Sequence, residues 1–450
     1  MIIHGPKSAN YDVDLKTILL TDWYHENPFA IYSEHLKTPQ IPDSTLINGK
    51  GKFNCSSVTE PSKCKEGSYW ETTFEPEKWH LLRFVNTATA STFRVSIDNH
   101  NMTIITADFT AIRPTRPVEF FDITVGQRYE VLVYANHTSG NFWLRSEPLK
   151  CNSGRTKGHI KDENVAKGII RYAGSIGSGD PTSNTHLAED LSYKCDDMEI
   201  DDLVPLFSRD YASVDFKKVY NASKKFEVAL VSIPENPAIA KLEIGHQMPL
   251  KDDIESLSAS EGKLWRIAGV PMVVNWSNPA LSILQDHSSR NKKIDPGDFP
   301  ESYAVVEAQP SEGGNHIIFH INGTAGPGSA KGVMHPIHIH GHDFVILAQG
   351  PGNFNETSIE DVIYNPVRRD VATMPADGYL IISFPVDNPG IWLLHCHLAW
   401  HASQGLALMI LERPADLGGI RGPPPGNCKR WREYLATASP PPYPMDDSGI

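Results

Sequence analysis

The sequence predicts an all-β protein built from tandem Greek-key β-sandwich domains. Short segments rich in β-branched and aromatic residues recur along its whole length, and most of them end at Gly, Pro, Asn or Asp. Long amphipathic helices are scarce. Many short strands separated by turn residues are typical of sandwiches and barrels with Greek-key connections. A chain of 450 residues is long enough for two or three such domains.

The expected strands fall into two groups along the chain. They cover residues 13–23, 80–85, 93–97, 102–109 and 128–135 in the first half, and 226–233, 303–308, 316–321, 343–349, 379–386 and 405–412 in the second. We expect one helix at 427–435 and an extended proline-rich tail at 439–450. The Gly-, Ser- and Pro-rich stretch 174–184 is the candidate linker. The predicted division is therefore one domain over 1–173, a linker over 174–195 and a second domain over 196–450.

Composition excludes several classes of function. The protein is 40% hydrophobic and 21% charged, as folded globular proteins are, and it carries a net charge of −13. This charge argues against nucleic acid or an anionic membrane as the main partner. The sequence lacks an apolar run of about 18 residues, so we expect no segment that spans a bilayer. The first ten residues, MIIHGPKSAN, do not resemble a signal peptide.

Cysteines and glycosylation sequons nevertheless indicate an oxidising compartment. Cys55 and Cys64 are close enough for a loop disulfide, Cys151 and Cys195 are a second possible pair, and Cys428 is left over. The alternative is that all of these are reduced thiols. Seven N-x-S/T sequons favour secretion and glycosylation. They begin at Asn54, Asn101, Asn136, Asn221, Asn275, Asn322 and Asn355. We expect that a segment preceding Met1 is missing from this sequence, which would explain both the odd cysteine and the lack of a leader.

Two dense histidine clusters carry the candidate chemistry. The first is HPIHIHGH at 335–342 and the second is HCHLAWH at 395–401. A single histidine is usually a packed or solvated residue, but two clusters in one half of a chain favour a metal site. Neutral imidazole and thiolate are the ligands that copper and zinc prefer.

Strand parity divides these side chains into two groups. Residues two apart on a strand share a face, whereas neighbours point to opposite faces. His395 and His397 therefore lie on one face and Cys396 on the other. The same rule joins His338 to His340. His335 lies three residues before His338 and tends to face the opposite way, and His401 lies beyond a turn and can swing back to the cysteine side. The two predicted groups are one containing His335, Cys396 and His401, and another containing His338, His340, His395 and His397.

The first group has the donors of a blue-copper electron-transfer site. Two histidines and one cysteine with a weak or absent axial ligand are typical of such sites. The spacing brings the axial position to Leu406, which cannot bind a metal. An apolar axial neighbour favours Cu(I) and raises the reduction potential. Met409 is the rival axial donor, but its odd separation from Leu406 predicts that it packs elsewhere.

The second group, with four imidazoles, predicts a multinuclear site. The backbone joins Cys396 directly to His395 and His397. One tripeptide therefore connects a site that takes electrons singly to a site able to deliver them to dioxygen.

At this level of detail the chain resembles the multicopper oxidases, and among them the laccases of ascomycete fungi. The resemblance rests on HPIHIHGHDF at 335–344, DNPGIWLLHCHLAWHASQGLALMILE at 387–412 and the terminal DSGI at 447–450. LINGKGKFNC at 46–55 and the segment 85–105 resemble the second domain of these enzymes. The resemblance to the multicopper oxidases implies three cupredoxin-like domains. This chain is expected to contain the last strand of the first domain and all of the second and third.

The resemblance also implies roles for the individual residues. His335, Cys396 and His401 match type 1 copper ligands with Leu406 at the axial place, and electrons enter at the His401 edge. His338 matches the type 2 ligand. The residues that match type 3 ligands are His340, His395 and His397. Copper is the implied cofactor, a small aromatic donor and O₂ are the implied partners, and the full-length protein is expected to be a secreted monomer.

Three departures from the family pattern matter. The family uses four further histidines from two H-x-H pairs in its first domain, and these pairs are not present here. We therefore expect half of the trinuclear ligand set to be missing. Cys428 matches a cysteine whose family partner lies in that same domain. Ala90 occupies the place of a carboxylate that accepts a proton from phenols, and no acid occurs between Arg83 and Asp98.

Three functions remain open on the sequence alone. The first is a laccase-like oxidase that couples four one-electron oxidations to the reduction of O₂ to water, although this chain alone is expected not to reduce oxygen. The second is a non-enzymatic copper electron carrier or an inactive remnant. The third is a zinc hydrolase that uses the first cluster. Such an enzyme would have no role for the Cys396 thiolate, which has the spacing of a blue-copper ligand.

Overall fold

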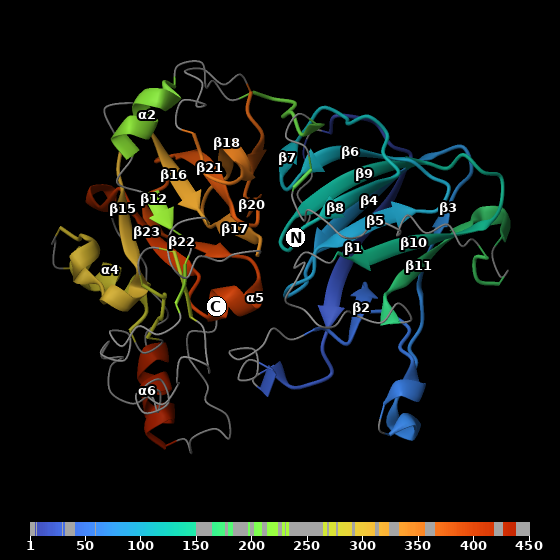
Figure 1. Ribbon diagram of the computed structural model, residues 1–450, viewed down its shortest axis with the longest axis horizontal. Coiled ribbons are helices and arrows are strands. Elements are labelled where there is room, and N and C mark those ends of the chain that lie inside the picture. Colours follow the sequence, from blue (N-terminus) through green and yellow to red (C-terminus); the bar gives the residue numbers. More distant parts are fainter. Residues whose placement is uncertain are drawn as a thin grey trace.

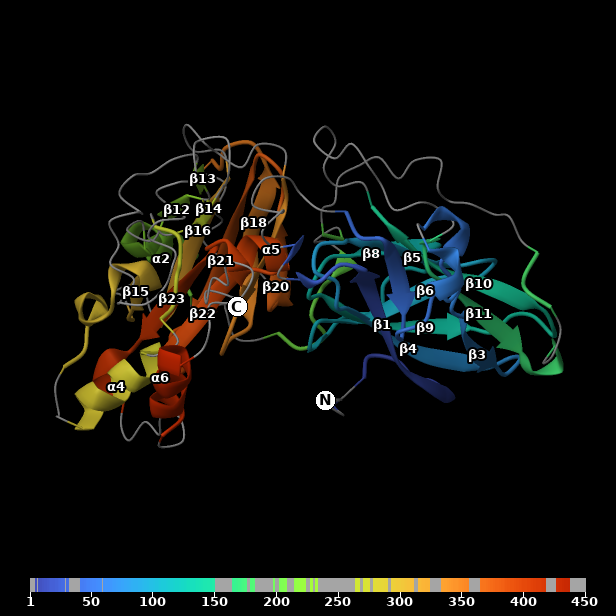
Figure 2. The ribbon, with the colours of Figure 1, turned by 90° about the horizontal axis from the view of Figure 1, so that it is seen from below.

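The computed structural model shows two β-rich halves that lie side by side (Figures 1 and 2). It describes residues 5, 7–28, 30–31, 41–58, 60–149, 164–175, 179–182, 197–198, 202–208, 214–223, 227–229, 231–233, 264–267, 270–275, 278–289, 293–310, 315–323, 333–355, 365–417 and 426–437.

The first half is a sandwich of two sheets. The larger sheet has the strand order β2-β1-β4-β9-β6-β7 and the facing sheet the order β3-β11-β10-β5-β8. The bounds are β1 Val13–Trp23, β2 Ser44–Ile47, β3 Trp70–Phe74, β4 Trp79–Asn86, β5 Phe93–Ile97, β6 Met102–Ala107, β7 Thr110–Ala111, β8 Phe120–Ile123, β9 Arg128–Tyr134, β10 Asn141–Pro148 and β11 Lys167–Tyr172.

The second half repeats this arrangement. One sheet has the order β12-β16-β21-β18-β19, the other has the order β15-β23-β22-β17-β20, and β13 pairs with β14 alone. The bounds are β12 Glu227–Ala229, β13 Val231–Ile233, β14 Leu264–Arg266, β15 Val305–Ala308, β16 His316–Asn322, β17 His335–Ile339, β18 Phe344–Pro351, β19 Arg368–Arg369, β20 Val371–Met374, β21 Gly378–Pro385, β22 Gly390–Cys396 and β23 Ala407–Glu412.

Within the described residues the helices are few and short, as expected. They are α2 Phe216–Ser223, α4 Ala280–Ser289, α5 Ala399–Ser403 and α6 Asn427–Thr437, with 3₁₀ turns η1 Cys55–Ser57, η2 Pro61–Lys63, η4 Ala173–Ser175, η9 Pro296–Asp298, η10 Glu301–Tyr303 and η12 Pro414–Asp416. The all-β prediction is confirmed, and α6 is the helix predicted at the C-terminal end. Every predicted strand segment contains a strand of the structure. None of the described helices has the length and apolar character needed to cross a membrane.

Alternating inward side chains fill the core of each sandwich. Phe84 on β4, Phe93 on β5 and Phe121 on β8 are fully or almost fully buried in the first half, and Phe319 and Phe384 pack edge to face in the second. Burying such side chains stabilises the fold by about 1.5–3 kcal/mol each. The period-two pattern of the strands therefore creates the two faces on which the histidines are later sorted.

A buried ion cluster joins the two halves. Arg369 on β19 donates to both carboxylate oxygens of Asp108 at 3.0 and 3.2 Å and to the Tyr129 hydroxyl at 2.9 Å. Arg128 on β9 donates to both carboxylate oxygens of Asp370 at 2.7 and 2.8 Å. Two arginines and two aspartates thus neutralise one another where water is largely excluded, which fixes how the halves pack.

The domain bounds remain a prediction. Much of the candidate linker lies outside the described residues. Residues 203–206 follow it and run beside the first half, where Pro205 bridges to Ile112 and the Arg113 amide donates to the Val204 carbonyl at 2.8 Å.

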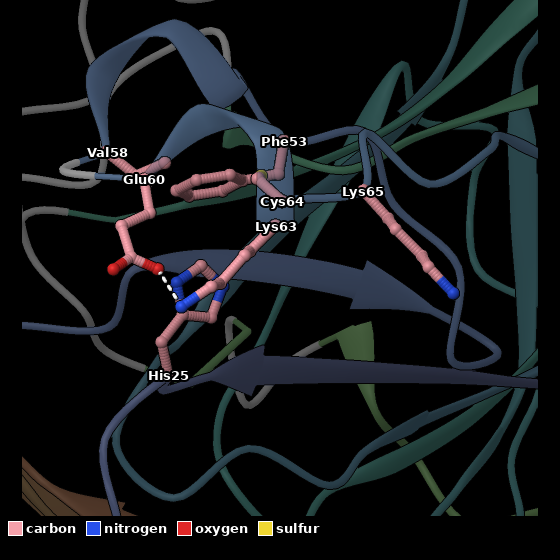
Figure 3. Close-up of a pocket in the computed structure, with 7 residues that line it drawn as sticks. All are labelled: His25, Phe53, Val58, Glu60, Lys63, Cys64 and Lys65. Atoms are coloured by element: carbon pink, nitrogen blue, oxygen red, sulfur yellow. Dashed lines mark ion pairs between the residues drawn. The ribbon is translucent and has the colours of Figure 1, made fainter.

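The disulfide between Cys55 and Cys64 is confirmed. It lies beside a surface pocket of about 470 Å³ (Figure 3), where the His25 and Phe53 rings meet with centroids 4.5 Å apart. Cys151, Cys195 and the side chain of Cys428 lie outside what the structure describes. The pocket lining contains none of the histidines of the two clusters.

Candidate metal centre

Two neighbouring strands carry most of the candidate ligands. β17 and β22 run antiparallel, with Ile337 opposite Cys396 and His338 opposite His395. Directly opposite residues share a face, so His338 and His395 point to one side of the sheet and Cys396 to the other. In Figure 1, β17, β20 and α5 lie on the side of the second half that faces the first half.

The first group is compact and buried. The Cys396 Sγ lies 3.7 Å from Nδ1 of His335 and 3.7 Å from Nδ1 of His401, and the two Nδ1 atoms are 3.2 Å apart. Helix α5 follows β22 directly and brings His401 back to the cysteine side. The structure therefore assembles the three side chains that strand parity and the following turn had placed together.

These distances fit one metal ion. Bonds of about 2.0–2.3 Å at angles near those of a trigonal or tetrahedral site place the donor atoms roughly 3.3–3.8 Å apart. Burial raises the pKa of the Cys396 thiol far above its usual value, and burial also lowers the pKa of His335 to about 3. His335 is therefore neutral near pH 7 and able to donate a lone pair. A bound metal cation would stabilise the Cys396 thiolate and so offset the free energy that its burial costs.

Leu406 lies beside this group. Its amide donates to the His401 carbonyl at 3.0 Å, and its own carbonyl accepts from the Cys396 amide at 3.0 Å. The Leu406 side chain is fully buried in the same apolar cluster as Cys396. Met409 is only partly buried, and it packs in part against the cluster that contains the α4 residues Ile283 and Leu284. The axial place of Leu406 stays a prediction.

The second group gathers on the opposite face. The Nε2 atoms of His340 and His395 are 3.3 Å apart, and His338 has its ring centroid 5.0 Å from that of His340 and 5.5 Å from that of His395. The His397 ring lies 5.6 Å from both His338 and His395. All four imidazoles of the predicted group therefore meet.

Hydrogen bonds to backbone carbonyls orient two of these rings. His338 Nδ1 lies 2.7 Å from the Asp370 carbonyl, and His395 Nδ1 lies 2.8 Å from the Cys396 carbonyl. Such bonds fix the tautomer and leave Nε2 free for a metal. Burial lowers the pKa of His338 to about 4 and that of His395 to about 3, so both rings are neutral near pH 7.

The first half of the chain also shapes this face. Gly126, in the turn between β8 and β9, has a φ of +85°, and a Cβ at this position meets His397 Cδ2 at 2.4 Å and Nε2 at 2.6 Å. A side chain on Gly126 is therefore incompatible with the observed place of the His397 ring.

We expect Gly126→Ala to displace His397 and to weaken copper binding at the second group by about tenfold or more. The measurement is copper bound per chain against free copper concentration. Gly49→Ala is the matched control, because Gly49 has a similar φ of +73° with nothing within 4 Å. Equal copper binding by the two variants would contradict the expectation.

His342 belongs to neither group. Its Nε2 lies 2.9 Å from Oε2 of Glu412, which is fully buried at the end of β23. Burial opposes a charge on His342, but Glu412 outweighs this effect and raises the pKa of His342. His342 is therefore the ion-pair partner of Glu412 and not a member of either ligand group.

Residues distant in sequence cover the cysteine side. Trp265 on β14 lies over His401 with ring centroids 4.4 Å apart, and its indole Nε1 donates to the Gln404 side chain at 3.0 Å. Trp265 is buried, so it shields His401 from water on this side.

The loop containing Ala90 is held by a carboxylate from another strand. The buried Asp22 accepts the backbone amides of Thr89, Ala90 and Ser91 at 2.8, 2.9 and 3.1 Å. The Thr89 carbonyl in turn accepts the Ala399 amide at the start of α5. Asp22 thus anchors the loop that in turn binds the start of α5.

The sequence did not reveal Gly126, Arg128, Trp265 or Asp22 as parts of the site. A glycine in the turn after a strand is too common to indicate a functional site. The other three residues lie within strands whose sequences show nothing unusual. Gly126 and Trp265 are singled out only by their contacts with His397 and His401, Arg128 by its bonds to Asp370 and Gly126, and Asp22 by its bonds to the loop at Ala90.

Comparison with known proteins then decides the family. The multicopper oxidase family models match residues 14–175 and 274–416. The chain belongs to the multicopper oxidases. Among curated relatives of this multicopper oxidase, dihydrogeodin oxidase of Aspergillus terreus is 34% identical and Laccase-1 of Botryotinia fuckeliana is 31% identical. These matches cover 100% of the chain and 71% and 68% of the respective relatives.

A solved laccase shares the fold. The crystal structure of the Botrytis aclada laccase matches with a TM-score of 0.76 and 32% identity, covering 100% of this chain and 73% of that one. The cupredoxin-like, all-β architecture and the resemblance to laccases are therefore confirmed. This protein is a laccase-like multicopper oxidase, and copper is the metal that its family implies.

Proposed function

We propose that this chain provides the electron-accepting copper site and four of the trinuclear ligands of an oxidase that couples oxidation of small aromatic donors to reduction of O₂. His335, Cys396 and His401 are the type 1 ligands, with Leu406 at the axial place. His338 is the type 2 ligand, and the type 3 ligands are His340, His395 and His397.

The observation that carries the proposal is the back-to-back arrangement of the two groups. Cys396 lies with His335 and His401 on one side, while its chain neighbours His395 and His397 lie with His338 on the other. Copper, when bound, supplies the one-electron redox chemistry that joins four donor oxidations to the conversion of O₂ and four protons into two water molecules. Neither a zinc hydrolase nor a simple electron carrier requires this pairing of sites.

The protein surrounds the first and the second ligand group differently. The buried Cys396, His335 and Leu406 hold a dry, apolar environment that favours the reduced metal. Trp265 packs against the His401 ring with centroids 4.4 Å apart, and the edge of the His401 ring is the proposed contact for an aromatic donor. His338 and His395 keep Nε2 free because their Nδ1 atoms are bound to carbonyls.

We further propose that the protein is secreted and glycosylated. The Cys55–Cys64 disulfide and the seven sequons support an oxidising, extracellular environment.

Copper loading followed by anaerobic titration tests the proposed function. We expect the loaded chain to show the strong blue absorption of a copper–thiolate bond, and a phenolic donor to bleach it with a one-electron stoichiometry. Admission of O₂ then tests the second group, and we expect reoxidation by this chain alone to be slow. A blue centre that phenols leave unchanged would reject the donor assignment, and rapid catalytic oxygen uptake would reject the half-set assignment.

A further inference from the structure

Two imidazoles of the second group are held by the first half of the chain. The contacts come from the turn between β8 and β9 and from the first residue of β9, Arg128. These residues lie more than two hundred positions before His338 and His397. The link consists of short hydrogen bonds on the way to His338, and of one hydrogen bond and one packing contact on the way to His397.

The first branch leads from Arg128 to His338. The guanidinium donates through Nη1 and Nη2 to the two carboxylate oxygens of Asp370, at 2.7 and 2.8 Å. The carbonyl of the same Asp370 accepts His338 Nδ1 at 2.7 Å and the Ile339 amide at 3.3 Å. The two hydrogen bonds from Arg128 thus fix the position of Asp370, and the backbone carbonyl of Asp370 orients the His338 ring.

The second branch leads from Arg128 to His397. Its Nη1 also donates to the Gly126 carbonyl at 2.9 Å, which holds the turn in place. The Gly126 Cα packs so closely against His397 that a Cβ there meets the ring at 2.4 Å. The position of this turn therefore limits the position of the His397 ring.

We propose that Arg128 is a positioning residue for His338 and His397, acting through Asp370 and Gly126. The inference rests on the proposed function in treating both histidines as copper ligands. Lysine cannot replace this arginine, because a single ammonium group does not present the rigid fork that bonds Asp370 twice while also reaching the Gly126 carbonyl.

The test compares Arg128→Lys with a matched control, Arg94→Lys. Arg94 also forms a two-pronged pair, with Asp122 at 2.8 and 2.9 Å, and it also lies over a phenylalanine ring, as Arg128 does. Nitrogen-15 NMR of the metal-free protein reads the tautomers of His338 and His397. Copper titration with electron paramagnetic resonance reads affinity and geometry at the second group.

We expect Arg128→Lys to turn His338 from one tautomer into a mixture and to lower copper affinity at the second group by about ten- to a hundredfold. The blue centre at Cys396 and the Arg94→Lys variant should remain as in the original protein. Unchanged tautomers together with an affinity within twofold of Arg94→Lys would overturn the proposal.

Two further variants separate the branches and keep the test decisive if Arg128→Lys does not fold. Asp370→Asn should loosen His338 alone, and Gly126→Ala should displace His397 alone. Normal ring signals in both would overturn the proposal. Absence of copper at the second group of the original protein would reject the proposed function, while the metal-free tautomers would still decide the role of Arg128.

Discussion

Replacement of Cys396 by serine is expected to abolish the blue copper centre. A hydroxyl does not ionise to replace the thiolate that holds the metal between His335 and His401, so the charge-transfer absorption is lost completely. Affinity at this group should fall by more than about a hundredfold, beyond the effect of losing a supporting residue. The measurements are visible absorption and copper stoichiometry after loading.

Stability gives a second readout for the Cys396→Ser variant. A copper concentration one hundred times the dissociation constant of the first group stabilises the original protein by about 2.7 kcal/mol. We expect this contribution to be absent in Cys396→Ser, with the metal-free proteins unfolding at similar urea concentrations. Leu408→Val, on the same sheet but outside the ligand set, is the control and should retain the blue absorption. A blue Cys396→Ser protein would show that another sulfur binds the metal.

Replacement of Asp108 by alanine is expected to cause a large loss of stability at the junction of the halves. It leaves the fully buried Arg369 without its carboxylate partner. Removing one partner of a buried ion pair costs about 3–5 kcal/mol. Urea unfolding of the metal-free protein measures this, with Glu71→Ala as the control. Glu71 forms a two-pronged pair with Arg171 at 2.8 and 2.7 Å, shorter than the pair of Asp108 with Arg369, but Glu71 is half exposed, so its loss should cost about 0.2–1 kcal/mol.

The pH dependence of this difference has a definite sign. Burial opposes the charge on Asp108, but Arg369 and Arg128 outweigh it and hold the pKa well below its usual value. A depressed folded-state pKa contributes stability above the unfolded-state pKa of about 4 and loses it as the pH falls towards the folded-state value. The difference between Asp108→Ala and the original protein should therefore be constant near pH 7 and shrink below about pH 4. A difference that grows on acidification would contradict this origin.

Strand periodicity made much of the site predictable. The alternation of side chains along a strand is a local property, so the sequence HCH already separates Cys396 from His395 and His397. The same rule grouped His338 with His340, and the antiparallel register of β17 and β22 places His338 directly opposite His395. The strand segments were predictable from their β-branched and aromatic residues and the turn residues that end them, and the C-terminal helix from its amphipathic pattern.

Other parts of the site depend on packing between distant segments. His342 has the same local setting as His340, yet it pairs with Glu412 because the end of β23 lies beside it. Asp22 binds the loop at Ala90 although no acid is near that loop in sequence.

The sequence by itself therefore determined the ligand types, their division between two faces of a sheet, and the family to which the protein belongs. The tertiary structure decided which residues orient the ligands: Gly126 and Arg128 reach the histidines from the first half, and Trp265 covers His401 from a separate strand. The physical reason is that side-chain alternation follows from the geometry of a single strand. Contacts between halves depend on how two complete sandwiches pack, and neighbouring residues carry no pattern that reports it.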